Sequence, residues 1–306
     1  MSVPSAIRGR FAPSPTGPLH LGNLRTALLS WLQARSLGGS WIVRMEDLDR
    51  ATASADHETR QLADLAALGL VPDERVVRQS DRFDIHRQAI AQLAALDRVY
   101  ECFCTRREIR EAAQAPHGDD VPYPQTCRSL TATRRAALLA EGRRPALRLR
   151  ADGEQFTVHD AVAGTYTGEA DDVVLQRNDG VPAYNLAVVV DDAAQGVTHV
   201  LRGDDLLSST PRQRLLQQLL GLPEPAYAHV PLVLGPDGSR LAKRHGAVTL
   251  ADLADRGLGS PGVLARLGVS LGLCEPGDEV TAIELLSRFD IRRIPTTPWQ
   301  MPPGEL

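Results

Sequence analysis

The sequence has few aromatic residues, few cysteines, no long apolar run and no excess of basic charge. Phe, Trp and Tyr make up 4% of the 306 residues, so a base-stacking surface for single-stranded nucleic acid is not indicated. The four cysteines are too few for a disulfide framework in a chain of this length. A net charge of −4 argues against a protein that coats DNA, although a local positive patch could still bind RNA. No segment has the apolar length of a signal-peptide core or a membrane span, so we expect a cytoplasmic protein without membrane contact.

The sequence does contain an alternation of short apolar runs and helical periodicities. Its length and its hydrophobic content of 43% suit one large or two moderate domains with a buried core. The patterns follow the order strand 7–11, helix 20–37, strand 41–45, helix 55–68, strand 75–78 and helix 83–96. This order predicts an α/β fold with a doubly wound parallel sheet, whose ligand crevice lies at the carboxyl ends of the strands.

The alternation is interrupted once and then resumes. Residues 100–170 contain paired cysteines, a loop rich in Pro, Gly and Asp, and short strands, which is typical of an insertion. We therefore expect a sheet domain in two halves (1–99 and 171–250), an inserted subdomain (100–170) and a short helical tail (251–306).

Residues 10–23, Arg-Phe-Ala-Pro-Ser-Pro-Thr-Gly-Pro-Leu-His-Leu-Gly-Asn, are typical of a strand, a turn and the start of a helix. Free backbone N–H groups and the helix dipole at such a start attract an anion. Gly17 and Gly22 let the backbone approach a ligand, while His20 and Asn23 share one helical face and could reach the same nucleotide. By itself the pattern fits an ordinary strand–turn–helix equally well.

A second glycine-flanked segment, residues 238–247, contains Gly-Ser-Arg-Leu-Ala-Lys-Arg-His-Gly-Ala and follows a predicted strand. A mobile lysine loop suits a reaction that passes through a charged phosphoryl transition state. On its own this segment would be interpreted as a basic surface loop. A functional role is favoured because the chain also contains residues 10–23.

Several segments in order along the chain resemble the class I aminoacyl-tRNA synthetases. Residues 20–23 are similar to the HIGH signature of that family and residues 240–244 to its KMSKS loop. Asn23 stands in place of the second histidine of HIGH, and Arg240 and Ala242 stand in place of a lysine and a serine of the loop.

The glutamyl branch of the family is indicated by segments 10–17, 44–49, 184–192 and 201–205. The resemblance covers residues 6–290. It implies a Rossmann-like sheet domain that carries an inserted zinc-binding and acceptor subdomain.

The resemblance implies that glutamate is activated by ATP to glutamyl-adenylate and then transferred to RNA. Glutamate presents two carboxylates and an ammonium, and arginine forks bind carboxylates bidentately. Arg10 and Arg202 match the glutamate-binding positions of the family, and Glu46 would pair with the ammonium. Tyr184 and Ser14 would add polar contacts.

The same resemblance implies that ATP lies at the helix start, on His20, Gly22 and Asn23. Lys243 would neutralise the charge that moves to pyrophosphate, so His20, Asn23 and Lys243 are the expected catalytic residues. An in-line attack on phosphorus needs positioning and charge neutralisation but no protein nucleophile, and Mg²⁺ is expected with the ATP.

Cys102, Cys104 and Cys127 form a third constellation. Three thiolates and a fourth donor suit a closed tetrahedral zinc site. On chemical grounds His117 is the commoner fourth donor. The resemblance to short glutamyl-type synthetases favours Tyr123, because their pattern ends in tyrosine, three residues and cysteine. We expect Tyr123, with His117 as the alternative.

The RNA acceptor is indicated by the end of the sequence. A glutamyl-tRNA synthetase would continue into a helical anticodon-binding domain, whereas here Leu306 follows a short helical tail. With the tyrosine-containing cysteine pattern, this resembles short members of the branch that attach glutamate to the queuosine base in the anticodon of tRNA(Asp). We expect that reaction, carried out by a monomer. A minimal synthetase that charges a tRNA 3′ end and a non-catalytic paralogue acting as a regulator remain alternatives.

Overall fold

The computed structural model describes residues 6–112, 123–239 and 248–302. Its strands are β1 (Arg8–Phe11), β2 (Ser40–Met45), β3 (Val77–Arg78), β4 (Val99–Cys102), β5 (Ala146–Leu149), β6 (Gln155–Asp160), β7 (Gly164–Glu169), β8 (Val174–Gln176), β9 (His199–Gly203), β10 (Ala226–Val230), β11 (Val233–Leu234) and β12 (Trp299–Gln300). Its α-helices are α1 (Leu21–Ser36), α2 (Ala55–Ala67), α3 (Phe83–Ala95), α4 (Arg106–Ala112), α5 (Ala132–Ala140), α6 (Tyr184–Ala194), α7 (Thr210–Leu220), α8 (Leu250–Asp255), α9 (Ser260–Ser270) and α10 (Ala282–Arg288). None of the helices in these ranges has the length and apolarity needed to cross a membrane.

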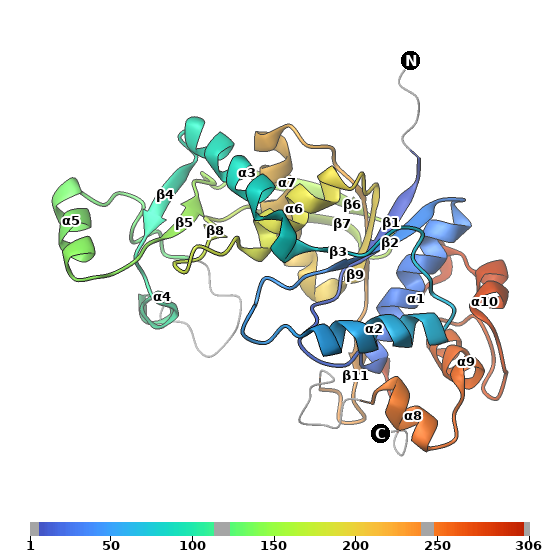
Figure 1. Ribbon diagram of the computed structural model, residues 1–306. Helices are drawn as coiled ribbons and strands as arrows, with labels where there is room; N and C mark the ends of the chain where they lie inside the picture. The colour runs from blue at the N-terminus through green and yellow to red at the C-terminus, as the bar shows by residue number, and fades with distance from the viewer. Residues whose placement is uncertain (1–5, 113–122, 240–247, 303–306) are drawn as a thin grey trace.

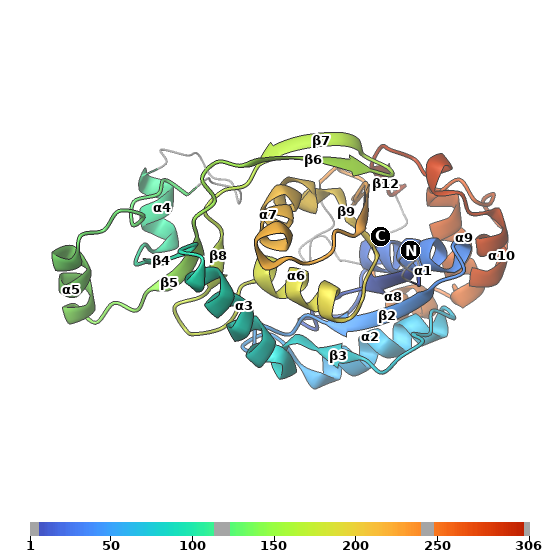
Figure 2. The same cartoon turned by 90° about the horizontal axis from the view of Figure 1, so that it is seen from above.

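The central sheet confirms the predicted α/β class. Within the described residues this sheet has seven strands in the order β3-β2-β1-β9-β10-β6-β7, with β3 and the β6–β7 hairpin at opposite edges (Figure 2). All neighbours pair in parallel except β6 and β7, which are antiparallel. The strand order reverses between β1 and β9. In open parallel sheets a ligand crevice forms at such a reversal, outside the carboxyl ends of the strands.

Helix α1 covers one face of the sheet beside this reversal and contacts β1, β2 and β9. Leucines and alanines on most of its turns are fully buried, and they join the apolar residues of α2 and of the tail helices α8–α10 in one core. The opposite face carries α3, α6 and α7, which share a second apolar core. Helices on both faces agree with the predicted doubly wound arrangement, and Figure 1 shows the tail helices gathered beside α1.

The strand pairing crosses the predicted domain boundaries. β4, β5 and β8 form a separate antiparallel sheet, at the end of the molecule where α4 and α5 lie (Figure 1). β6 and β7 fall within the predicted insertion 100–170, yet β6 joins the central sheet through Tyr227 of β10, which pairs with Asp160. β8 falls in the predicted second half and belongs to the small sheet. Local patterns locate strands, but the choice of partner strand depends on contacts far apart in the sequence.

Candidate active site

Strand alternation brings polar side chains together on one face of the central sheet. Phe11, Leu201 and Val230 belong to the core on the α1 side. Because successive strand residues point to opposite faces, Arg10 and Arg202 lie on the other face, the one covered by α6 and α7. His229 of β10 is paired with Arg202 of β9 in the sheet register.

One wall of the site is a buried ion-pair network. Asp192 of α6 accepts a 2.6 Å hydrogen bond from Nη1 of Arg44 and lies 3.4 Å from Nε of Arg10. Nη2 of Arg44 lies 3.2 Å from Oε1 of Glu46, and Nη1 of Arg10 also donates to the carbonyl of Leu201 at 3.0 Å. Arg44 is fully buried. Burial alone would lower the pKa of Arg44, but Asp192 and Glu46 raise it, so this guanidinium stays charged. Burial raises the pKa of Glu46.

The other wall is built around Arg202. Its Nε, Nη1 and Nη2 donate to Nε2 of His229, Oε1 of Gln213 and Oγ1 of Thr210 at 2.9, 2.8 and 3.0 Å. The side chain of Arg202 is buried, and burial also lowers the pKa of His229, which keeps that imidazole neutral. All three acceptors are therefore neutral, and among the described residues no ion pair to Arg202 is found. A buried cation of this kind is stabilised by an anionic ligand.

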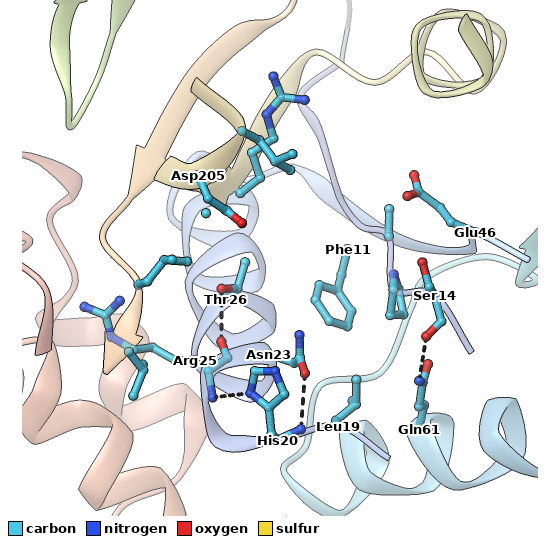
Figure 3. A pocket seen from close by; sticks show the side chains of 18 of the residues that line it. Phe11, Ser14, Leu19, His20, Asn23, Arg25, Thr26, Glu46, Gln61 and Asp205 are labelled. Atoms are coloured by element: carbon cyan, nitrogen blue, oxygen red, sulfur yellow. Dashed lines mark hydrogen bonds between the residues drawn. The ribbon is translucent and has the colours of Figure 1, made fainter. Parts of the chain in front are cut away.

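The start of α1 is organised by reciprocal caps. Nδ1 of His20 accepts from the backbone N–H of Gly22 at 3.2 Å, and Oδ1 of Asn23 accepts from the backbone N–H of His20 at 3.2 Å (Figure 3). Burial lowers the pKa of His20, which agrees with a neutral ring that accepts at Nδ1. Its proton then resides on Nε2, which can donate to a phosphate.

A cavity of about 550 Å³ connects these three groups. Its lining includes all the predicted glutamate and ATP residues that the structure describes: Arg10, Ser14, His20, Gly22, Asn23, Glu46, Tyr184 and Arg202. Ser14 and Glu46 lie across the pocket from the α1 residues (Figure 3). Burial raises the pKa of Tyr184, so its phenol stays protonated and can donate a hydrogen bond. Ser14 is exposed, and its carbonyl accepts a hydrogen bond from Gln61.

Lys243, with Arg240 and Ala242, lies outside the described residues. Described residues on either side of 240–247 lie beside the pocket. Before this segment Val233 lines the pocket, and after it the carbonyl of Val248 accepts from the N–H of Leu21 at 3.0 Å.

The three predicted cysteine ligands lie together in the small-sheet region. The Sγ atoms of Cys102, Cys104 and Cys127 lie within 4.8 Å of one another, and Oη of Tyr123 is 3.2 Å from Sγ of Cys102 and 3.7 Å from Sγ of Cys104. Zinc–sulfur bonds of about 2.3 Å in a tetrahedron place ligand atoms about 3.8 Å apart, so these four donors fit a zinc ion. His117, the alternative fourth donor, lies outside the described residues.

A protein-family model named tRNA synthetases class I (E and Q), catalytic domain, matches residues 6–299. The chain belongs to this class I synthetase family. It is 58% identical over 291 residues to a glutamyl-Q tRNA(Asp) synthetase of Nocardia farcinica, covering 95% of this chain and 92% of the relative. It is 42% identical to glutamate–tRNA ligase 1 of Nitrosococcus oceani, covering 94% of this chain and 61% of that ligase.

Solved structures agree with the family. A crystal structure of a glutamate tRNA ligase from Elizabethkingia meningosepticum, in complex with its amino acid, superposes with a TM-score of 0.81 at 29% identity. The match covers 96% of this chain and 66% of that ligase. This synthetase chain therefore shares the fold of a glutamate-binding enzyme over nearly its whole length.

Sequence reasoning missed several residues of this synthetase site. Arg44 and Asp192 lie inside the recognised segments, but no role was predicted for them because the network depends on which face each side chain takes. Asp160 and His229 belong to no recognised segment. A signal for His229 was present, since it is a polar residue within an otherwise apolar strand.

Proposed function

We propose that this chain activates L-glutamate with ATP and transfers the glutamyl group to the queuosine base in the anticodon of tRNA(Asp). The observation that carries the glutamate assignment is Arg202, a buried cation with neutral acceptors that lines the same cavity as Arg10 and Glu46. The queuosine acceptor is supported by the printed name of the relative at 58% identity, of which this chain covers 92%.

In the proposed first step, a carboxylate oxygen of glutamate bonds to the α-phosphorus of ATP, and the bond from that phosphorus to the β-phosphate oxygen breaks. Arg10 and Arg202 hold the two carboxylates, Glu46 pairs with the ammonium, and Tyr184 donates a hydrogen bond. The N–H groups at the start of α1 and Nε2 of His20 bind phosphate oxygens. These contacts place the reacting atoms, which is the main catalytic requirement of phosphoryl transfer.

Lys243 is proposed to neutralise the leaving pyrophosphate, and Mg²⁺ bound with the ATP would supply further positive charge there. In the second step an acceptor hydroxyl attacks the acyl carbon, the bond from that carbon to the phosphate oxygen breaks so that AMP leaves, and the hydroxyl proton is released. With tRNA as its substrate, the chain is proposed to act in the cytoplasm, and as a monomer.

The acceptor is tested by glutamylation of tRNA(Asp) with and without queuosine, using radiolabelled glutamate and this chain. We expect label only on queuosine-containing tRNA(Asp). Equal labelling of both forms would overturn the acceptor, and labelling of tRNA(Glu) would favour a synthetase that charges 3′ ends.

We further propose that Cys102, Cys104, Cys127 and Tyr123 hold one structural zinc ion, which would tie the segment before α5 to the end of β4. Metal analysis of Cys104→Ser should find less zinc than the wild type, which should hold one ion per chain. Cys274→Ser is the matched control, because Cys274 lies outside the cluster. It follows α9, and its thiol donates to the carbonyl of Ala265 within that helix. Equal zinc in the wild type and Cys104→Ser would contradict this site.

A further inference from the structure

We infer that Asp160 and His229 form a positioning pair that holds Arg202 in its ligand-binding orientation. The inference rests on the proposed function and adds to it two residues that do not touch the substrate. Neither belongs to the short segments on which the sequence resemblance rests.

The geometry forms a chain of hydrogen bonds across three neighbouring strands. Oδ2 of Asp160, the last residue of β6, lies 2.6 Å from Nδ1 of His229 on β10. Nε2 of His229 lies 2.9 Å from Nε of Arg202 on β9. All three side chains are buried.

The donors and acceptors in this chain allow one arrangement. A guanidinium nitrogen can only donate, so Nε2 of His229 must accept and its proton must lie on Nδ1. Nδ1 then donates to Asp160. Burial alone would raise the pKa of Asp160, but hydrogen bonds from His229 and from backbone N–H groups hold it at about 2, so the carboxylate is ionised at neutral pH.

Asp160 also has an ordinary structural role, which a test must separate from positioning. Its Oδ1 accepts from the backbone N–H groups of Val162 and Ala163, and the backbone N–H of His229 lies 3.0 Å from both carboxylate oxygens. These bonds shape the turn into β7. A variant that removed the whole side chain would damage this turn.

Asp160→Asn separates the two roles. The amide oxygen can replace Oδ1 and keep its three backbone hydrogen bonds. The amide nitrogen takes the place of Oδ2, gives up that oxygen's bond to the backbone N–H of His229, and donates to Nδ1 of His229. The imidazole proton must then move to Nε2, where it faces the N–H of Arg202, so two donors oppose each other. The KM for glutamate in ATP–pyrophosphate exchange should rise about tenfold or more, with the KM for ATP unchanged within about twofold.

Two substitutions of His229 provide a matched pair. In His229→Gln an amide oxygen can occupy the place of Nε2 and still accept from Arg202. In His229→Asn the shorter amide can still contact Asp160 but does not reach Arg202. Positioning predicts a near-normal KM for glutamate in the Gln variant and a KM raised about tenfold in the Asn variant, whereas a structural role alone predicts no advantage for Gln.

The combination of Asp160→Asn with His229→Gln tests whether Asp160 acts through the imidazole. Without an imidazole there is no tautomer to reverse, so the double variant should have the KM for glutamate of His229→Gln alone. A further rise in the double variant would show that Asp160 acts by another route and would overturn the pair.

The tautomer itself is read without activity, from the ¹⁵N chemical shifts of the His229 ring. The wild type should show the proton on Nδ1, and Asp160→Asn should show it on Nε2. If the wild type carries the proton on Nε2, or if Asp160→Asn has a wild-type KM for glutamate, the inference is wrong. Absent exchange with glutamate in a wild type that shows the Nδ1 proton would instead refute the proposed function. If Asp160→Asn does not fold, the His229 pair decides.

Discussion

The two walls of the pocket hold their arginines by different chemistry. On the β1 side, Arg10 and Arg44 share Asp192, and Arg44 also contacts Glu46. On the β9 side, Arg202 donates only to neutral side chains of β10 and α7. We call the first wall balanced, because its arginines pair directly with carboxylates, and the second unbalanced, because Arg202 is linked to the carboxylate of Asp160 only through His229.

This difference explains how one pocket can match an amino acid with two carboxylates and one ammonium. Among the described residues no carboxylate pairs directly with Arg202, so its guanidinium is available for a carboxylate of glutamate, which carries one net negative charge. Complementary charges of this kind contribute specificity more than bulk affinity.

The largest expected effect comes from the unbalanced wall. Arg202→Gln should lower kcat/KM for glutamate by about a hundredfold or more, the scale of losing one partner of a buried charge pair. Arg10→Gln should have a smaller effect, because Asp192 keeps Arg44 as a partner. Steady-state exchange kinetics with both variants compare the walls directly, and a larger loss in Arg10→Gln would reverse the assignment.

The neighbouring aspartates of α6 sharpen the comparison. Asp191 is paired with Arg82 and His86 outside the pocket, whereas Asp192 serves the balanced wall. Asp192→Asn should raise the KM for glutamate about tenfold, since Glu46 would then face two arginines alone. Asp191→Asn should lower the free energy of unfolding by about 3–5 kcal/mol, with little change in that KM.

Denaturant unfolding and exchange kinetics separate these two outcomes. Equal KM values for glutamate in Asp191→Asn and Asp192→Asn would contradict the role of Asp192 in the site.

The pH dependence of glutamate binding should follow Glu46. Burial raises the pKa of Glu46, so its protonation begins at a higher pH than for an ordinary glutamate. As the pH falls through that raised pKa, the partner of the substrate ammonium is lost and the KM for glutamate should rise.

The sign for folding is opposite, because a buried acid with a raised pKa favours the fold in its protonated form, below the unfolded pKa. Protonation of Glu46 should therefore weaken glutamate binding without destabilising the chain. The KM for glutamate of Glu46→Gln, measured over the same pH range, should be higher than that of the wild type and independent of pH. A wild-type slope in that variant would assign the titration to another group.

The smallest effect is expected at the start of α1, outside both walls. His20→Ala should lose about 1 kcal/mol of unfolding free energy with the cap. His20→Asn keeps a capping acceptor but loses the Nε2 donor, so its stability should stay near that of the wild type while the KM for ATP rises. If His20→Asn changed the KM for glutamate but not the KM for ATP, the assignment of His20 to ATP binding would be wrong.

Much of the local structure could be predicted from the sequence. The helices predicted at 55–68 and 83–96 are observed as Ala55–Ala67 and Phe83–Ala95. Their apolar spacing and the polar residues at their starts are local signals. The pairing of β6 with β10 joins Asp160 to Tyr227, and no local pattern specifies that partner.

In the candidate site, too, some residues are indicated by local sequence and others only by contacts far apart in the chain. Arg10, Glu46 and Arg202 could be predicted because they lie in recognisable segments. The residues that orient them could not, because Asp192 lies 148 positions from Arg44 and His229 lies 69 positions from Asp160 in the chain. Their roles depend on strand register and on which face each side chain takes, and these follow from the assembled sheet.

The most direct measurement is ATP–pyrophosphate exchange with glutamate compared with glutamine, in the presence of tRNA(Asp). A pocket in which Arg202 has no directly paired carboxylate should reject the neutral side-chain amide, so kcat/KM should favour glutamate by about a thousandfold or more. Exchange at similar rates with both amino acids would contradict the charge complementarity of the two walls.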